Sequence, residues 1–156
     1  MRISEILKPA CVKVPLKGAD KQAALFELVD VLSGHGEIPD ADQLKQAVWQ
    51  RETIRTTGIG HGIAVPHGKT EGLTQLNMAI GLTQEPLEFG AIDGKPVELI
   101  ILLASPIDQT GPHVQALAKI SRLLIDDTFR DAIKQAESPE KLYMMLVEHE
   151  AATAGV

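Results

Sequence analysis

VELIILLAS, at residues 97–105, is a nearly continuous apolar run, and LNMAIGLTQ, at residues 76–84, is a second run of the same kind. Runs of this length without strict alternation are typical of strands whose two faces are both covered. A turn at Asp93-Gly94 precedes the run at 97–105. Both segments therefore predict central strands of a sheet.

Helical periodicity comes before these strands. A helix is expected to begin near Asp20, whose side chain can cap it, and to stop at Gly34 and Gly36. Its apolar positions recur at helical spacing and are Ala24, Leu25, Leu28, Val29 and Leu32. Most of this face is expected to lie in the core.

A second helix is predicted from Asp40 to about Glu52. Gln43 stands three residues after Asp40, which is the spacing of a capping box. The apolar positions that follow are Leu44, Ala47 and Val48. Arg51 therefore falls on the last turn of this helix.

Helical periodicity returns after the strands. Pro112 suits the first position of a helix, which puts His113 in its first turn, and the apolar positions are Val114, Leu117, Ala118, Leu124 and Ile125. A shorter helix is expected to hold Phe129, Ile133 and Ala136. A last helix opens at Ser138 as its cap, with Pro139 behind it.

The order of these segments predicts the fold class. Helices on both sides of the strands favour an α/β fold, a three-layer α/β/α domain with a mixed central sheet flanked by helices. A chain of 156 residues fits one domain. We expect this domain to cover residues 1–150, followed by a frayed tail at residues 151–156.

Composition excludes several classes of function. Fifteen basic and twenty-one acidic residues give a net charge of −6, which argues against nucleic-acid binding and against an anionic membrane surface. The single Cys11 rules out an intramolecular disulfide and thiolate metal clusters. The N-terminal residues lack the apolar core of a signal peptide, and no run reaches the length of a membrane span. We therefore expect a cytoplasmic protein without membrane insertion.

Residues 56–70, TTGIGHGIAVPHGKT, contain four glycines and two histidines, and the second histidine is followed by Gly68 and Lys69. Ile63, Ala64 and Val65 predict a short strand that ends at Pro66, with His67 just past it. A P-loop would need glycine at position 63, where isoleucine stands. No GxSxG or HExxH motif is present. The segment therefore matches none of these common catalytic motifs.

What remains is an imidazole on a glycine-rich turn at the end of a strand. Neutral imidazole is nucleophilic near physiological pH, so His67 can carry a transferred group. A phosphoryl group would need hydrogen-bond donors and a cation around it. Arg51 and His113 are candidate side chains, and the candidate loop amides belong to Gly58, Gly60, Gly62 and Gly68.

These residues resemble the fructose/mannitol-type enzyme IIA proteins of the phosphotransferase system. The resemblance rests on Arg51-Glu52, on residues 57–60 (TGIG), on residues 62–69 (GIAVPHGK) and on residues 108–110 (DQT) with His113. It covers essentially the whole chain and is nearest to the stand-alone nitrogen-regulatory enzyme IIA.

The resemblance implies that an HPr-like carrier phosphorylates His67 on Nε2, with Arg51 and His113 stabilising the phosphate. We expect no cofactor and no metal, and, because no enzyme IIB or transporter domain is attached, a regulatory output through phosphorylation-dependent partner binding. In this family the position of His61 is often asparagine, so His61 receives no role in transfer. The Gly111-Pro112 pair departs from the family pattern. The downstream target and the oligomeric state are left open.

Other interpretations compete with this one. The chain is alternatively a sugar-specific enzyme IIA that passes the phosphoryl group to a separate enzyme IIB, or a non-catalytic binding module of the same fold. A weaker alternative is a metal-dependent hydrolase built on His61, His67 and His113, although few carboxylates stand near them in sequence. Individually, each residue also has an ordinary structural explanation, such as Arg51 complementing a helix dipole.

Overall fold

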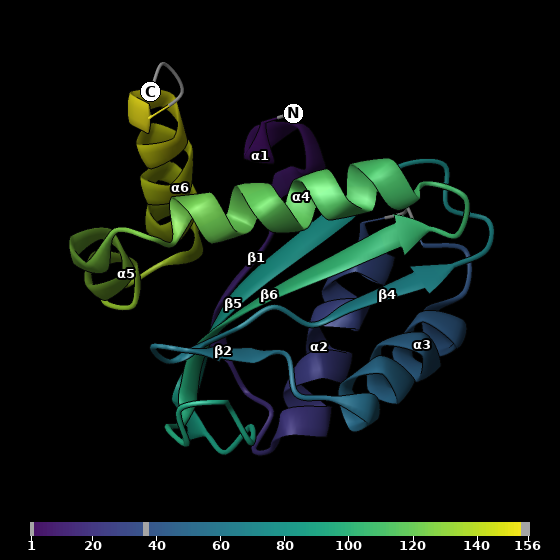
Figure 1. Ribbon diagram of the computed structural model, residues 1–156, viewed down its shortest axis with the longest axis horizontal. Coiled ribbons are helices and arrows are strands. Elements are labelled where there is room, and N and C mark those ends of the chain that lie inside the picture. The colour runs from purple at the N-terminus through teal and green to yellow at the C-terminus, as the bar shows by residue number, and fades with distance from the viewer. Residues whose placement is uncertain (1, 36–37, 154–156) are drawn as a thin grey trace.

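The computed structural model describes residues 2–35 and 38–153. Its centre is a six-stranded mixed sheet in the order β1-β5-β6-β3-β2, with β4 also paired to β6 (Figure 1). The strands are β1 Leu7–Leu16, β2 Gly58–Gly60, β3 Ile63–Ala64, β4 His67–Thr70, β5 Asn77–Leu87 and β6 Val97–Pro106. The prediction of a mixed central sheet is confirmed.

Strand β6 is the axis of the sheet. It runs antiparallel to β5 on one side, and parallel to β3 and then β4 on the other. All its residues except Glu98 are buried, as expected for a strand covered on both faces. Burying a side chain such as Leu99 or Ile100 contributes roughly 1.5–3 kcal/mol, so this apolar run stabilises the whole sheet.

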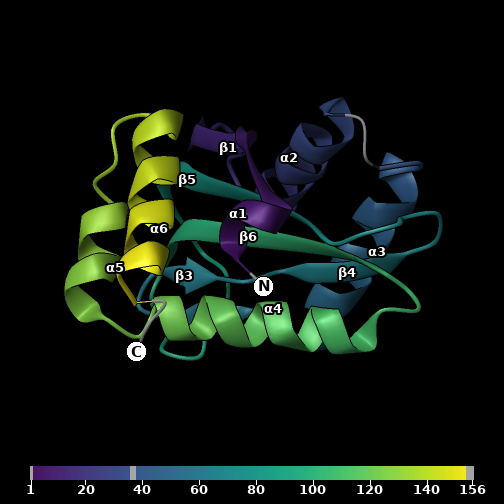
Figure 2. The same cartoon turned by 90° about the horizontal axis from the view of Figure 1, so that it is seen from above.

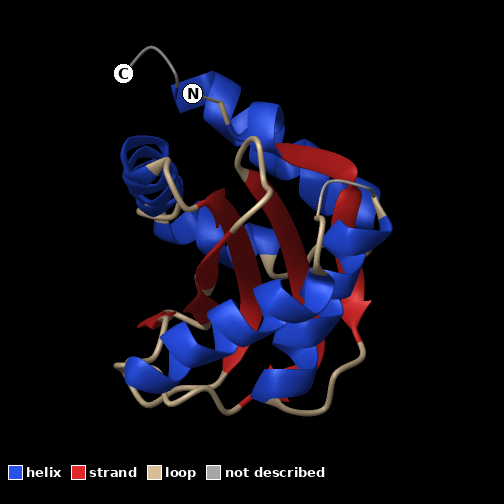
Figure 3. Cartoon of the chain, turned by 90° about the vertical axis from the view of Figure 1, so that its right-hand side faces the viewer, coloured by secondary structure: helices blue, strands red, loops and turns tan. Residues whose placement is uncertain are grey.

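Helices cover both faces of the sheet (Figures 2 and 3). Helices α2 (Lys21–Gly34) and α3 (Ala41–Ile54) lie on one face. On the other face, α1 (Ile3–Ile6), α4 (Thr110–Leu123) and α6 (Pro139–Thr153) bring apolar side chains to β5 and β6, and α5 (Asp127–Ile133) precedes α6. The predicted three-layer α/β/α arrangement is confirmed.

The predicted helix starts are capped as expected, with one difference. Asp20 accepts a hydrogen bond from the amide of Ala23 at 2.8 Å, and Asp40 accepts one from the amide of Gln43 at 3.1 Å. The side chain of Gln43 does not complete a capping box. It instead accepts a hydrogen bond from the hydroxyl of Thr70, at 2.5 Å, and this bond ties α3 to β4.

Several helix boundaries differ from the sequence prediction. Helix α5 ends at Ile133, so Ala136 lies beyond it, and α4 ends at Leu123, before Leu124 and Ile125. Helix α4 begins at Thr110, so Pro112 is its third residue, and its N-cap residue Gln109 makes no side-chain capping hydrogen bond. Helix α6 continues to Thr153, so residues 151–153 of the expected frayed tail are helical. Residues 154–156, like Gly36, lie outside the described residues.

Three strands were not predicted. Strand β1 contains Pro9 and Pro15, which normally argue against a strand, but β1 is an edge strand where a missing amide is tolerated. Strands β2 and β4 are short and rich in glycine, so neither has the pattern of a strand. Their pairing with β3 and β6 makes them strands, not their own sequence.

Candidate active site

His67 is the first residue of β4, directly after the proline that ends the run from β3. The carbonyl of Pro66 accepts a hydrogen bond from the amide of Leu103 at 3.0 Å, which holds this turn against β6. The ring Nδ1 of His67 lies 2.9 Å from the carbonyl oxygen of Val65. A carbonyl can only accept, so Nδ1 carries the proton and Nε2 keeps its lone pair. Nε2 is therefore the nucleophilic nitrogen.

The structure brings His113 next to His67. Their ring centroids are 5.3 Å apart, with an angle of 64° between the ring planes. His113 comes from the first turns of α4 and is only 7% exposed. Its Nδ1 lies 2.6 Å from the hydroxyl of Ser105, at the end of β6. The first turns of α4 and the first residue of β4 therefore meet beside the C-terminal half of β6.

Burial keeps both imidazoles neutral. It lowers the pKa of His67, and the positive charges of Arg51 and Lys69 lower this pKa further, against the hydrogen bond to Val65. Burial lowers the pKa of His113 to about 4, and His67 and Lys69 act in the same direction. At neutral pH the site therefore holds two uncharged rings, one of which is a ready nucleophile.

An NMR titration of the unphosphorylated protein tests whether both rings are neutral at pH 7. We expect the ring signals of His113 to titrate with a midpoint near 4, and those of His67 below the ordinary value of about 6.5. Folding lowers the pKa of both histidines. Their contribution to the free energy of unfolding is therefore fully present above pH 6.5 and is lost as the pH falls through the pKa values of the folded protein. A midpoint for His113 at or above 6.5 would contradict the burial argument.

Two cavities open on either side of His67 and Arg51. The first cavity, of about 310 Å³, is lined among others by Thr57, Gly58 and Leu117. The second cavity, of about 490 Å³, is lined by residues that include Gly68, Lys69 and His113. A group on His67 would therefore have solvent-accessible space on both sides.

Two cations flank this space. The guanidinium of Arg51 donates to the carbonyl of Arg55 at 2.9 Å, a bond that holds it on the last turn of α3 beside His67. The ammonium of Lys69 donates to the hydroxyl of Thr110 at 3.5 Å, at the start of α4. Sequence reasoning singled out Arg51 but gave Lys69 no part. Both charges suit an anionic group at His67.

Glu52 is the buried support that sequence reasoning missed. It is 3% exposed and accepts hydrogen bonds from the amide of Thr57, at 3.0 Å, and from the Thr57 hydroxyl. The ammonium of Lys21 lies 2.7 Å from its carboxylate. These contacts anchor the start of the glycine-rich segment. Its signal is in the sequence, because Glu52 continues the buried stripe of α3 at a spacing of four from Val48.

The structure does not gather the four glycines of the segment around one group. Gly58 and Gly68 line the two cavities beside His67. A Cβ on Gly68 would lie 2.9 Å from a methyl of Val48, so glycine lets β4 pack directly on α3. Gly60, the last residue of β2, and Gly62, in the β2–β3 turn, have φ of +94° and +76°. Their positive φ serves the turn.

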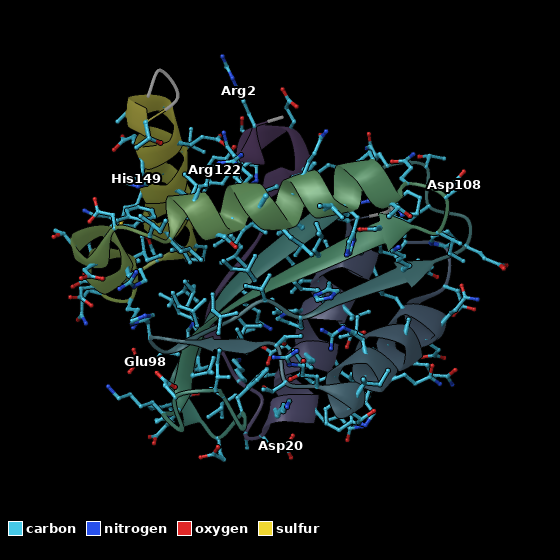
Figure 4. The ribbon with its side chains drawn as sticks, in the orientation of Figure 1. Arg2, Asp20, Glu98, Asp108, Arg122 and His149 are labelled. Atoms are coloured by element: carbon cyan, nitrogen blue, oxygen red, sulfur yellow. The ribbon has the colours of Figure 1, made fainter. Side chains whose placement is uncertain are left out.

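His61 sits in that same turn. Its φ of +59° is followed by the positive φ of Gly62, as in the two-residue hairpin turns that favour asparagine at the first position. Asparagine would therefore suit this position as well as histidine does. His61 lines a separate cavity with Glu98 at the start of β6, at the opposite end of that strand from Asp108 (Figure 4). His67 pairs with Leu103, late in β6.

The metal-hydrolase alternative needs His61, His67 and His113 in one cluster. The separate cavity of His61 removes it from the pair. Within residues 2–35 and 38–153, no group of three or more histidine, cysteine or carboxylate side chains is placed to hold a metal ion.

None of the helices in the described ranges has both the length and the apolar character that a membrane span requires.

The chain belongs to the phosphoenolpyruvate-dependent sugar phosphotransferase system EIIA 2 family, whose model matches residues 5–149. This places it in a family of phosphotransfer proteins and confirms the resemblance found in the sequence.

Particular relatives fall into two groups. The nitrogen regulatory protein of Klebsiella oxytoca is 33% identical over 149 residues, which are 95% of this chain and 91% of that protein. The fructose-specific EIIABC component of Bacillus subtilis is 30% identical over 150 residues, 96% of this chain but only 24% of its own length. The chain thus spans about a quarter of that longer protein.

A solved structure repeats the fold. The crystal structure of nitrogen regulatory protein IIA-Ntr from Neisseria meningitidis superimposes with a TM-score of 0.84 at 30% identity. The match covers 92% of this chain and 98% of the other. The α/β architecture described above is therefore that of the enzyme IIA structures.

Proposed function

We propose that this chain is a cytoplasmic histidine phosphocarrier that accepts a phosphoryl group from an HPr-like protein on Nε2 of His67. The observation that carries the proposal is the hydrogen bond from His67 Nδ1 to the Val65 carbonyl. It leaves the Nε2 lone pair free between two open cavities. Neutral imidazole so oriented needs no base to become a nucleophile.

The transfer step balances without any further reactant. The lone pair of His67 Nε2 attacks the phosphorus of a phosphohistidine on the donor. The bond from phosphorus to the donor's ring nitrogen breaks, and its electron pair returns to that ring. His67 keeps the proton on Nδ1, and the Val65 carbonyl stabilises the positive charge that develops on the ring. Catalysis is then a matter of positioning and charge.

The flanking side chains supply that charge stabilisation. A phosphoryl group carries about −1.5 to −2 charges at neutral pH. Arg51, which lines both cavities, would neutralise part of this charge, and Lys69 would do so from the second cavity. His113 would add a hydrogen bond from a neutral ring, which avoids repelling the positive charge that develops on His67. We assign Arg51 and His113 as catalytic residues.

The glycines have two different parts in the proposal. Gly58 and Gly68 line the cavities beside His67 and let the backbone pack closely there, because a Cβ would lie 2.8 Å from the Cβ of Ala91 at Gly58 and 2.9 Å from a methyl of Val48 at Gly68. The amide of Gly58 is already engaged by the hydroxyl of Thr56 at 3.1 Å, so the side-chain donors carry most of the phosphate binding. Gly60 and Gly62 act only through the turn that sets the spacing of β2 and β3.

A charging reaction tests the proposal. The protein is incubated with phosphoenolpyruvate, enzyme I and an HPr-like carrier, and its intact mass is measured. We expect the addition of one phosphoryl group that is labile to acid and more stable to base, as a phosphoramidate is. A non-catalytic binding module of this fold would show no mass change, and that result would refute the phosphocarrier function.

We further propose that the output is regulatory, through phosphorylation-dependent binding of a protein partner. The similarity to nitrogen regulatory proteins over nine tenths of their length supports this output. Phosphate on His67 would change the charge of the same open surface on which partners must rest. An acidic or apolar partner surface would be expelled, whereas one that offers arginines would be recruited.

Affinity purification from cell extract measures this switch. Fully phosphorylated protein and a His67→Ala protein serve as the two baits. We expect the two sets of bound proteins to differ in at least one member that binds through the His67 surface. Identical sets would exclude the regulatory switch. Rapid loss of phosphate to an added enzyme IIB would instead favour the sugar-specific alternative.

A further inference from the structure

The buried hydroxyl of Ser105 is unusual for its place in the fold. Ser105 is fully buried near the end of β6, after a run of apolar residues in the centre of the sheet. Burying a hydroxyl costs free energy unless it finds a partner, and alanine would fill this position without that cost. Its partner is Nδ1 of His113, at 2.6 Å. The hydroxyl therefore acts on His113.

The direction of this hydrogen bond decides what His113 can do. A neutral imidazole has one N–H donor and one lone pair, and a serine hydroxyl can act either way. If Ser105 donates, Nδ1 of His113 is the acceptor and the ring proton is on Nε2. If Ser105 accepts, the proton is on Nδ1 and Nε2 presents a lone pair. Burial keeps His113 neutral, so only one of these forms applies at a time.

The neighbourhood of His113 favours the first direction. His67 already presents a lone pair on Nε2, because its Nδ1 donates to Val65. The two ring centroids are 5.3 Å apart. If Nε2 of His113 also carried a lone pair, neither ring would offer a hydrogen-bond donor to the other ring's Nε2 or to an incoming anionic group. An Nε2–H on His113 instead complements both. The two rings then hold opposite tautomers.

We propose that Ser105 is a positioning residue: its hydroxyl donates to Nδ1 of His113 and holds the proton on Nε2, so that His113 is a hydrogen-bond donor toward a phosphoryl group on His67. The role in transfer rests on the phosphocarrier function proposed above. The tautomer itself does not, because it is set in the uncharged protein.

The register of the sheet supports this assignment. Ser105 lies directly opposite Lys69 across the β4–β6 pair, and His67 pairs with Leu103 two residues earlier. The strand pair therefore presents the nucleophile, one cation and the positioning hydroxyl from a single rigid ladder. His113 is added from α4 and meets that ladder through Ser105. Rigid strands hold such geometry more tightly than a loop does.

The test measures the tautomer and the charging rate separately. Ring ¹⁵N NMR of the unphosphorylated wild-type protein at pH 7 is expected to find the His113 proton on Nε2 and the His67 proton on Nδ1. In Ser105→Ala the His113 signals should shift toward a mixture of both tautomers. Phosphoryl acceptance from the HPr-like carrier should become about tenfold slower, since one oriented hydrogen bond is lost.

Thr83→Val is the matched control. The Thr83 hydroxyl is also buried in the sheet, on β5, and has no hydrogen-bond partner among the described residues. Removing it should change neither the tautomer of His113 nor the charging rate. A wild-type His113 with its proton on Nδ1 would overturn the proposal, even if Ser105→Ala failed to fold. So would a folded Ser105→Ala protein with an unchanged tautomer, whatever its rate.

The two proposals fail in different ways. A wild-type protein that never gains a phosphoryl group, yet shows the expected tautomers, refutes the phosphocarrier function and leaves the Ser105 hydrogen bond standing. A protein that charges normally but has the opposite His113 tautomer refutes only the assignment of Ser105.

Discussion

A His67→Ala protein is expected to gain no phosphoryl group under conditions in which the wild-type protein gains one. The reason is that the substitution removes the only ring whose Nε2 lone pair is fixed beside Arg51 by a backbone hydrogen bond among the described residues. His113 is not a substitute, because its ring is buried and Nδ1 is occupied by Ser105. Intact mass after incubation with phosphoenolpyruvate, enzyme I and the HPr-like carrier measures the effect.

His61→Ala is the matched control for this experiment. His61 is six residues away in the sequence but lines a different cavity, so its loss should leave the charging rate at the wild-type level. Circular dichroism should confirm that both variants fold, since neither ring lies in the apolar core. Acid-labile phosphate on His67→Ala in the amount found on the wild type would place the acceptor elsewhere.

Arg51→Ala and His113→Ala are each expected to slow phosphoryl acceptance on the order of a hundredfold while leaving the fold intact. Each removes one preorganised donor to the transferring group, and single donors of this kind are typically worth about that much in rate. Arg51 contributes a charge that no neutral side chain replaces, and His113 contributes a hydrogen bond close to His67. The rates are measured in single-turnover phosphorylation, with this protein limiting and the phosphorylated carrier in excess.

Arg122→Ala controls for charge and for helix α4. Arg122 is a cation on the last turn of the helix whose first turns carry His113, and it lies at the end of α4 remote from Asp108 (Figure 4). It lines a separate cavity with Lys119. Its removal should change the rate by less than about threefold, as expected for a distant surface charge. Equal rates for all three variants and the wild type would remove Arg51 and His113 from the site.

Local chemistry explains what the sequence predicted well. Asp20 and Asp40 cap their helices through side-chain bonds to amides three residues on, a contact that depends on nothing distant. The apolar run at residues 97–105 needs cover on both faces wherever it lies, so its central place in the sheet follows from composition. The short strand before His67 likewise follows from Ile63 and Ala64, although His67, expected in a turn, instead begins strand β4, which pairs with β6.

The sequence by itself therefore determined the helices, the central strands, the short strand before His67 and the family. Tertiary structure alone decided which groups surround that histidine. His113 is 46 residues away, and only the parallel pairing of β4 with β6, followed by α4, puts the two rings 5.3 Å apart.

The same holds for the residues that hold this arrangement. Nothing in the local sequence indicates that the Ser105 hydroxyl reaches His113. The buried stripe of α3 indicates that Glu52 is buried, but its partners Lys21 and Thr57 are known only from the tertiary structure. His61, near His67 in sequence, is turned away by the positive φ of a tight turn. Hydrogen bonds between distant segments form only when the chain folds, so no local pattern records which groups are paired.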